Sequence, residues 1–125
     1  MKIKERITCF LSSLIITILL IRLYLFIFPN TNFAIGSYGV HHIFIGSVLL
    51  IIAVILLMFN ISNCSTYILG GISTALIIDQ IIFLIVTDGS DKNYLSRTSL
   101  YGALVLTFVI ILTVLVLYFS KEKKR

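Results

Sequence analysis

The sequence Tyr67-Ile-Leu-Gly-Gly-Ile-Ser-Thr-Ala-Leu-Ile-Ile-Asp79-Gln-Ile-Ile-Phe-Leu-Ile-Val-Thr87 is an apolar run that contains one carboxylate. A run of about 20 apolar residues is long enough to cross a bilayer as a helix. An ionisable group at that depth is costly, so it is expected to face a partner, a cavity or a substrate path instead of lipid. This stretch therefore predicts a membrane helix whose polar residue points into a bundle.

Small residues follow the same face of this predicted helix. Gly71, Ala75 and Asp79 recur at intervals of four residues, which places them on one side of a helix. Small residues let a neighbouring helix approach closely within a membrane. Gly71 and Ala75 are therefore predicted packing positions, and Asp79 should face the neighbouring helices.

The composition indicates one membrane domain that covers residues 1–125. Hydrophobic residues make up 59% of the chain and charged residues only 12%, whereas charged residues alone are about a quarter of an ordinary soluble domain. The pattern predicts an all-α bundle with spans at about 7–29, 40–59, 67–87 and 99–119. A signal peptide is the alternative for the first run, but the run is longer than a usual signal core.

The net charge of +5 is concentrated at the two ends of the chain. Basic residues precede the first apolar run and follow the last one, as the positive-inside rule describes for cytoplasmic flanks. We therefore expect both termini to be cytoplasmic, in the cytoplasmic membrane of a prokaryote, with the lipid bilayer as a partner. Nucleic acid is not expected, because its recognition needs a basic face on a soluble module.

The two cysteines, Cys9 and Cys64, fall near the cytoplasmic side in this arrangement. Thiols stay reduced in that compartment. The pair is therefore interpreted as packing residues or palmitoylation sites, and not as a disulfide framework.

Depth in the membrane brings several polar residues to one level. Arg22 and Asp79 each lie roughly 10–12 Å below the outer boundary at the helical rise of 1.5 Å per residue. His41 and His42 enter the second span from the same outer side, and Gln80 is adjacent to Asp79. The sequence therefore predicts a polar cluster in the outer half of the bundle. It also predicts that the second helix starts before the histidines.

Three functions remain open for this cluster. His41, His42 and Asp79 carry ligand types that suit zinc and similar divalent ions, so the cluster is predicted to bind a metal ion or a lipid headgroup, with hydrolytic chemistry as an extension. Asp79 could instead be the titrating group of an ion- or proton-coupled transport component, which predicts a homo-oligomer. In the third alternative, a structural Arg22–Asp79 ion pair holds together a non-catalytic subunit that has a membrane partner protein.

Other residues near this level have weaker assignments. Tyr94, Ser96 and Arg97 lie just above the membrane boundary and complete the candidate binding set. Gly46 follows His42 by four residues, so it lies on the same helix face and allows a neighbouring backbone to approach. The sequence contains no known hydrolase, nucleotide-binding or metalloprotease motif, and it leaves open whether the protein is an enzyme.

The order of these residues resembles a group of small, uncharacterised prokaryotic integral-membrane proteins. Their pattern is HHxxxG, then GxGxxLxxDE, then YWS, and this chain has His41-His42 with Gly46, then Gly71 to Gln80, then Tyr94-Leu-Ser96. Ser73 replaces the second Gly, Gln80 replaces Glu and Leu95 replaces Trp. The resemblance covers about residues 38–102 and implies that these residues form a unit. It implies no activity.

Overall fold

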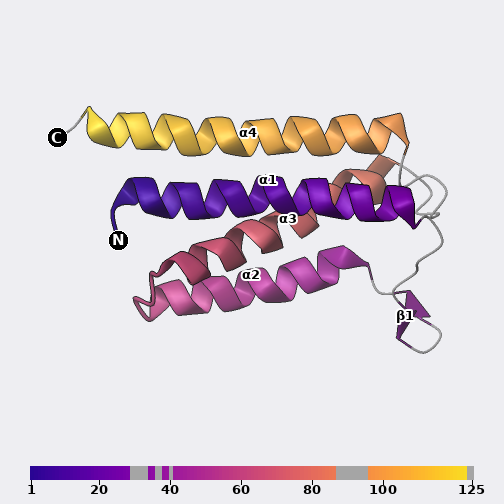
Figure 1. The fold of residues 1–125 in the computed structure, drawn as a ribbon, viewed down its shortest axis with the longest axis horizontal. Coiled ribbons are helices and arrows are strands. Elements are labelled where there is room, and N and C mark those ends of the chain that lie inside the picture. The colour runs from indigo at the N-terminus through magenta and orange to yellow at the C-terminus, as the bar shows by residue number, and fades with distance from the viewer. Residues whose placement is uncertain (29–33, 36–37, 40, 87–95, 124–125) are drawn as a thin grey trace.

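The described part of the chain contains four α-helices and a two-stranded hairpin (Figure 1). In this computed structural model, the structure describes residues 1–28, 34–35, 38–39, 41–86 and 96–123. The helices are α1 (Ile3–Ile27), α2 (His42–Met58), α3 (Cys64–Val86) and α4 (Arg97–Glu122). Strands β1 (Ala34–Ile35) and β2 (Tyr38–Gly39) pair antiparallel between α1 and α2.

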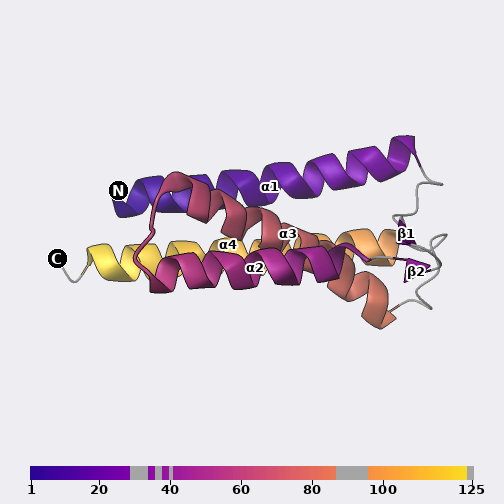
Figure 2. The ribbon, with the colours of Figure 1, turned by 90° about the horizontal axis from the view of Figure 1, so that it is seen from below.

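Three of these helices, α1, α3 and α4, are long and apolar enough to cross a membrane. Helix α2 is equally apolar but has 17 residues, or about 25 Å of helix against a hydrocarbon core of about 30 Å. The predicted all-α four-helix bundle is confirmed, and three of its helices are consistent with an integral membrane protein. Both termini lie at one end of the bundle, and the hairpin lies at the other (Figures 1 and 2).

Helix α3 is the centre of the bundle. It crosses obliquely between the other helices and packs against each of them (Figure 2). Its window of highest hydropathy is 39% buried, compared with 11% for the corresponding windows of α1 and α4. The predicted organisation around residues 67–87 therefore corresponds to the helix that contacts all its neighbours.

Glycines make each of the contacts with α3 close. A Cβ atom at Gly71 would lie 2.4 Å from the backbone oxygen of Phe10 in α1. A Cβ at Gly46 of α2 would lie 2.9 Å from the backbone oxygen of Ser73 in α3. Gly102, which the sequence analysis did not select, has the same role for α4, because its Cβ would lie 2.2 Å from the Ile82 side chain. Side chains are thus excluded at three crossings, as expected for packing in a membrane.

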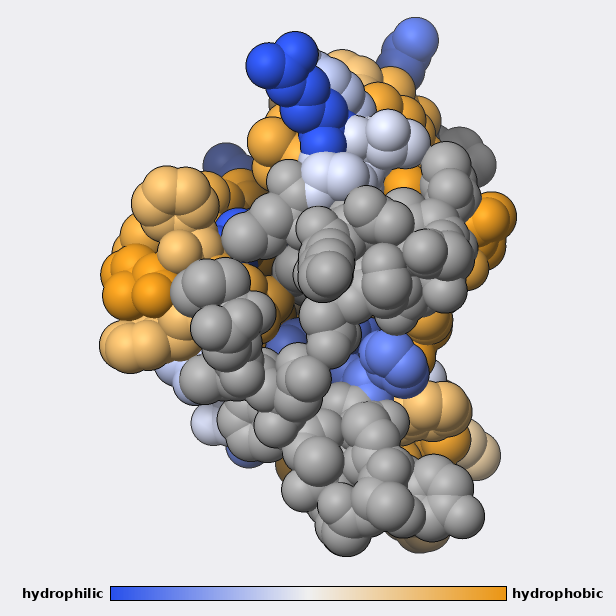
Figure 3. Space-filling view, turned by 90° about the vertical axis from the view of Figure 1, so that its right-hand side faces the viewer, coloured by the Kyte–Doolittle hydropathy of each residue, from blue (hydrophilic) through white to orange (hydrophobic). Residues whose placement is uncertain are grey.

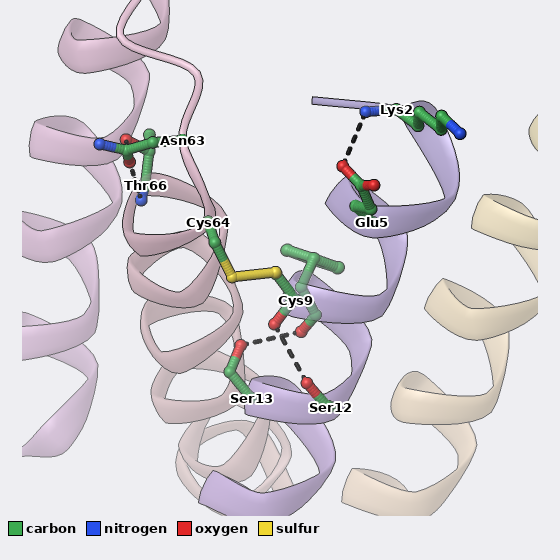
Figure 4. Close-up of a disulfide and its surroundings, with 9 residues drawn as sticks. Lys2, Glu5, Cys9, Ser12, Ser13, Asn63, Cys64 and Thr66 are labelled. Carbon is green, nitrogen blue, oxygen red and sulfur yellow. Dashed lines mark hydrogen bonds between the residues drawn. A yellow bond between two sulfur atoms is a disulfide. The ribbon is translucent and has the colours of Figure 1, made fainter.

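The cysteines form a bond that the sequence analysis did not predict (Figure 4). Cys9 of α1 and Cys64, the first residue of α3, form a disulfide with a Cα–Cα distance of 5.8 Å. The structure therefore contradicts the interpretation of the two cysteines as separate packing or palmitoylated residues, because it brings their sulfur atoms within bonding distance. The reason is the tertiary arrangement: α1 and α3 approach closely at the end of the bundle where the termini lie, which no spacing in the sequence reveals.

The connection between α2 and α3 is held by side-chain hydrogen bonds. Asn60 adopts a positive φ of 60°, a backbone conformation in which Asn is tolerated better than most residues. The Asn63 carboxamide oxygen accepts hydrogen bonds from the backbone N–H of Thr66 at 2.9 Å and from its hydroxyl at 2.8 Å. This capping of the first turn of α3 lets α2 and α3 pack as an antiparallel pair.

A matched pair of glycine substitutions tests the α1–α3 crossing. Gly71→Ala should lower the free energy of unfolding by about 1–3 kcal/mol, because its methyl group collides with the α1 backbone. Gly70→Ala is the control, since its Cβ would lie 3.7 Å from the Phe10 ring, an ordinary contact. Unfolding in detergent micelles provides the measurement, and an equal effect of the two substitutions would contradict the close crossing.

Candidate functional site

The centre of the candidate site is an ion pair between two helices. The Arg22 Nε atom of α1 donates to the Asp79 Oδ1 atom of α3 at 2.6 Å. The Asp79 side chain is 1% exposed and that of Arg22 is 12% exposed. The Arg22–Asp79 pair was one of the three alternatives that matched depth in the sequence left open, and the structure contains it.

The same guanidinium reaches a third helix. Its Nη2 atom donates to the Ser99 carbonyl oxygen at 3.3 Å and to the Ser99 hydroxyl at 3.2 Å. Ser99 is buried in the first turn of α4, where its backbone N–H donates to the Ser96 hydroxyl oxygen at 3.3 Å. Arg22 therefore connects α1, α3 and α4 at one level of the bundle.

Gln80 attaches the remaining helix. Its carboxamide oxygen accepts a hydrogen bond from the backbone N–H of Ile43 at 2.8 Å. Ile43 is in the first turn of α2, where backbone N–H groups have no partner within their own helix. The buried Gln80 side chain thus satisfies a helix terminus that would otherwise be costly inside an apolar bundle.

This contact corrects the predicted start of the second helix. The helix was expected to begin before the histidines, but it begins at His42, and His41 is extended with φ −72° and ψ 140°. Gln80 takes the place of a preceding turn by accepting the hydrogen bond from Ile43. His42 is therefore the first residue of α2, and His41 lies just outside the helix as its N-cap.

The metal-site prediction is not supported by the arrangement of the described residues. Among them, no group of three His, Cys, Asp or Glu side chains is placed to hold a metal ion. His42 interacts electrostatically with Asp79, but Arg22 already binds that carboxylate. A guanidinium in contact with the proposed ligand repels a divalent cation, which opposes binding there.

One oxygen of the central carboxylate lacks a hydrogen-bond partner within the described part of the chain. Asp79 Oδ2 is buried and accepts no hydrogen bond from the described residues. Buried polar atoms in native proteins are nearly always hydrogen-bonded, so this exception calls for an explanation. It is the one feature of the cluster that favours proton binding over a purely structural role.

The other predicted residues are distributed around this centre. Ser96 is the N-cap of α4, and Arg97 is exposed in its first turn. Tyr94 lies outside the described residues. Figure 3 shows the end of the molecule at which the hairpin lies, where hydrophilic residues are visible between hydrophobic residues.

Two residues of this region were not selected from the sequence. Ser99 was named only as the first residue of the predicted span at 99–119, and a single hydroxyl at the start of an apolar run does not by itself indicate a buried partner. Gly102 lies three residues further on, on the same face, where it lets Ile82 of α3 approach. Through these two residues, the start of α4 packs closely against α1 and α3.

Comparison of the chain with protein-family models, with curated proteins and with solved structures gives no match. The functional argument therefore rests on the geometry of the site.

Proposed function

We propose that this chain is a non-enzymatic membrane component in which the Arg22–Asp79 cluster fastens the helices together. The observation that supports this proposal is the use of one guanidinium by three helices, through Asp79 and Ser99. A charge committed to internal partners in this way is poorly placed to bind a substrate. The protein then acts through contacts with other membrane components, a second copy of itself or a partner chain.

Proton exchange at Asp79 is the second candidate. It is favoured by the buried Oδ2 atom, which lacks a hydrogen-bond partner among the described residues. Proton relays in membrane proteins use carboxylate and histidine side chains, and His42 interacts with this carboxylate. In this alternative, Ser99 would keep the Arg22 guanidinium hydrogen-bonded while Asp79 carries a proton.

We also propose that both termini face the cytoplasm of a prokaryotic cell. Residues 1–6 and 119–125 contain seven basic and two acidic side chains, which favours cytoplasmic placement of both ends. The Cys9–Cys64 disulfide lies at this same end. Because the cytoplasm keeps thiols reduced, the pair would be a dithiol in the growing cell and would close on oxidation.

A flux measurement separates the two candidate functions. Wild-type protein and Asp79→Asn, reconstituted in liposomes with an internal pH-sensitive dye, should show the same slow proton leak if the cluster is structural. The control is Glu122→Gln, which removes an exposed carboxylate at the opposite end of the bundle. A wild-type flux that Asp79→Asn abolishes and Glu122→Gln preserves would overturn the structural proposal in favour of proton exchange.

Thiol trapping tests the proposed orientation. Cells are quenched with acid, and the protein is then denatured and treated with a maleimide reagent, which should label both cysteines. Protein from oxidised membranes, treated in the same way, should be labelled at neither. In Cys9→Ser, Cys64 should be labelled in both conditions, which controls for access. A disulfide already present in untreated cells would place this end on the oxidising side and contradict the orientation.

A further inference from the structure

A cavity lies at the opposite end of the bundle from the Arg22–Asp79 cluster. Its volume is about 460 Å³, within the range of about 300–1,000 Å³ that is typical of small-molecule sites. All four helices contribute to its lining, including Phe10 of α1, Ala53 of α2, Gly70 of α3 and Val114 of α4. The lining residues come from the N-terminal parts of α1 and α3 and the C-terminal parts of α2 and α4.

The walls of this cavity are almost entirely apolar. A cavity with such a lining is unfavourable for water, which needs two to four polar partners. Gly70 has no side chain and leaves room beside it, because among the described residues only the Phe10 ring lies within 4 Å of the position that a Cβ atom would take. The cavity therefore suits a hydrocarbon chain.

Basic side chains lie at the mouth of the cavity. Arg6 of α1 and Lys121 of α4 both line it. The Arg6 guanidinium carbon lies 5.8 Å from the centre of the Tyr67 ring, and its Nε atom donates to the Met1 carbonyl oxygen at 3.2 Å. Two cationic groups thus stand where an acyl chain in the cavity would end.

The acidic side chains near this mouth are outnumbered by the basic ones. Glu5 accepts a hydrogen bond from the backbone N–H of Lys2 at 2.9 Å. Glu122 accepts one from the Tyr118 hydroxyl. The local charge that remains for a ligand is therefore positive, since the two termini together carry seven basic side chains and two acidic ones.

We propose that this cavity binds one acyl chain of an anionic phospholipid, whose phosphate group is held by Arg6 and Lys121. Charge complementarity selects the anionic headgroup, because a basic side chain near the surface favours anionic lipid. The apolar walls select the chain. This inference does not depend on the role of Asp79, which lies at the other end of the bundle.

Tryptophan fluorescence tests the site, because the natural chain contains no Trp. Leu117→Trp places one reporter at a cavity-lining position, in vesicles that contain brominated phosphatidylglycerol or brominated phosphatidylcholine. We expect preferential quenching by the anionic lipid, and about a fivefold loss of that preference in Arg6→Gln and again in Lys121→Gln. Lys123→Gln, which removes a charge outside the cavity lining, should have a smaller effect.

Two further variants distinguish an acyl chain bound in the cavity from a general attraction of anionic lipid to the protein surface. Phe108→Trp, a reporter on a side chain that is 65% exposed and outside the cavity, should show equal quenching by the two lipids. Gly70→Leu places a bulky side chain in the cavity while retaining both cations, so it should reduce the preference at Leu117→Trp. Equal quenching in the wild-type background, or a preference that Gly70→Leu leaves unchanged, would overturn the proposal and leave ordinary annular lipid or a second copy of the chain as the occupant.

Discussion

The structure depends on one constraint: a carboxylate and a guanidinium inside an apolar bundle must form an ion pair. Each charge alone would be costly at that depth, and the Arg22–Asp79 contact of 2.6 Å removes much of that cost. Pairing also fixes the register of α1 against α3, because the two side chains meet at only one relative position of the helices. The hydrogen bonds to Ser99 extend the same constraint to α4.

Close packing of α3 makes this constraint effective. In a bilayer, helices gain little from excluding lipid, so association depends on van der Waals contact and on interhelical hydrogen bonds. Glycines at the three crossings bring the neighbouring helices within reach of short side chains such as Asp79 and Ser99. At the end where the termini lie, the structure has an apolar cavity, whereas the other end has the polar cluster.

The sequence predicted the parts of this arrangement that depend on hydrophobicity, helical period and depth. The apolar runs, the face of Gly71, Ala75 and Asp79, and the Arg22–Asp79 pairing all follow from position along the chain. The Cys9–Cys64 bond did not, since it depends on which helices approach and at what angle.

The start of α2 also escaped prediction, for a related reason. An earlier start was expected because the apolar run at 43–59 is short for a span, but the Gln80 carboxamide, 37 residues away in sequence, accepts the hydrogen bond of Ile43 in the first turn. The metal-site prediction counted ligand types correctly but omitted the guanidinium that competes for the same carboxylate. In both cases a long-range polar contact overrides the local pattern.

A double-mutant cycle tests the central claim most directly, namely that the ion pair stabilises the bundle by satisfying two buried charges. The free energy of unfolding would be measured for wild type, Arg22→Met, Asp79→Leu and the double variant. Each single substitution should cost about 3–5 kcal/mol, because it leaves one buried charge unpaired, while the double variant should return close to wild-type stability. Single substitutions without effect, or costs that simply add in the double variant, would contradict the account.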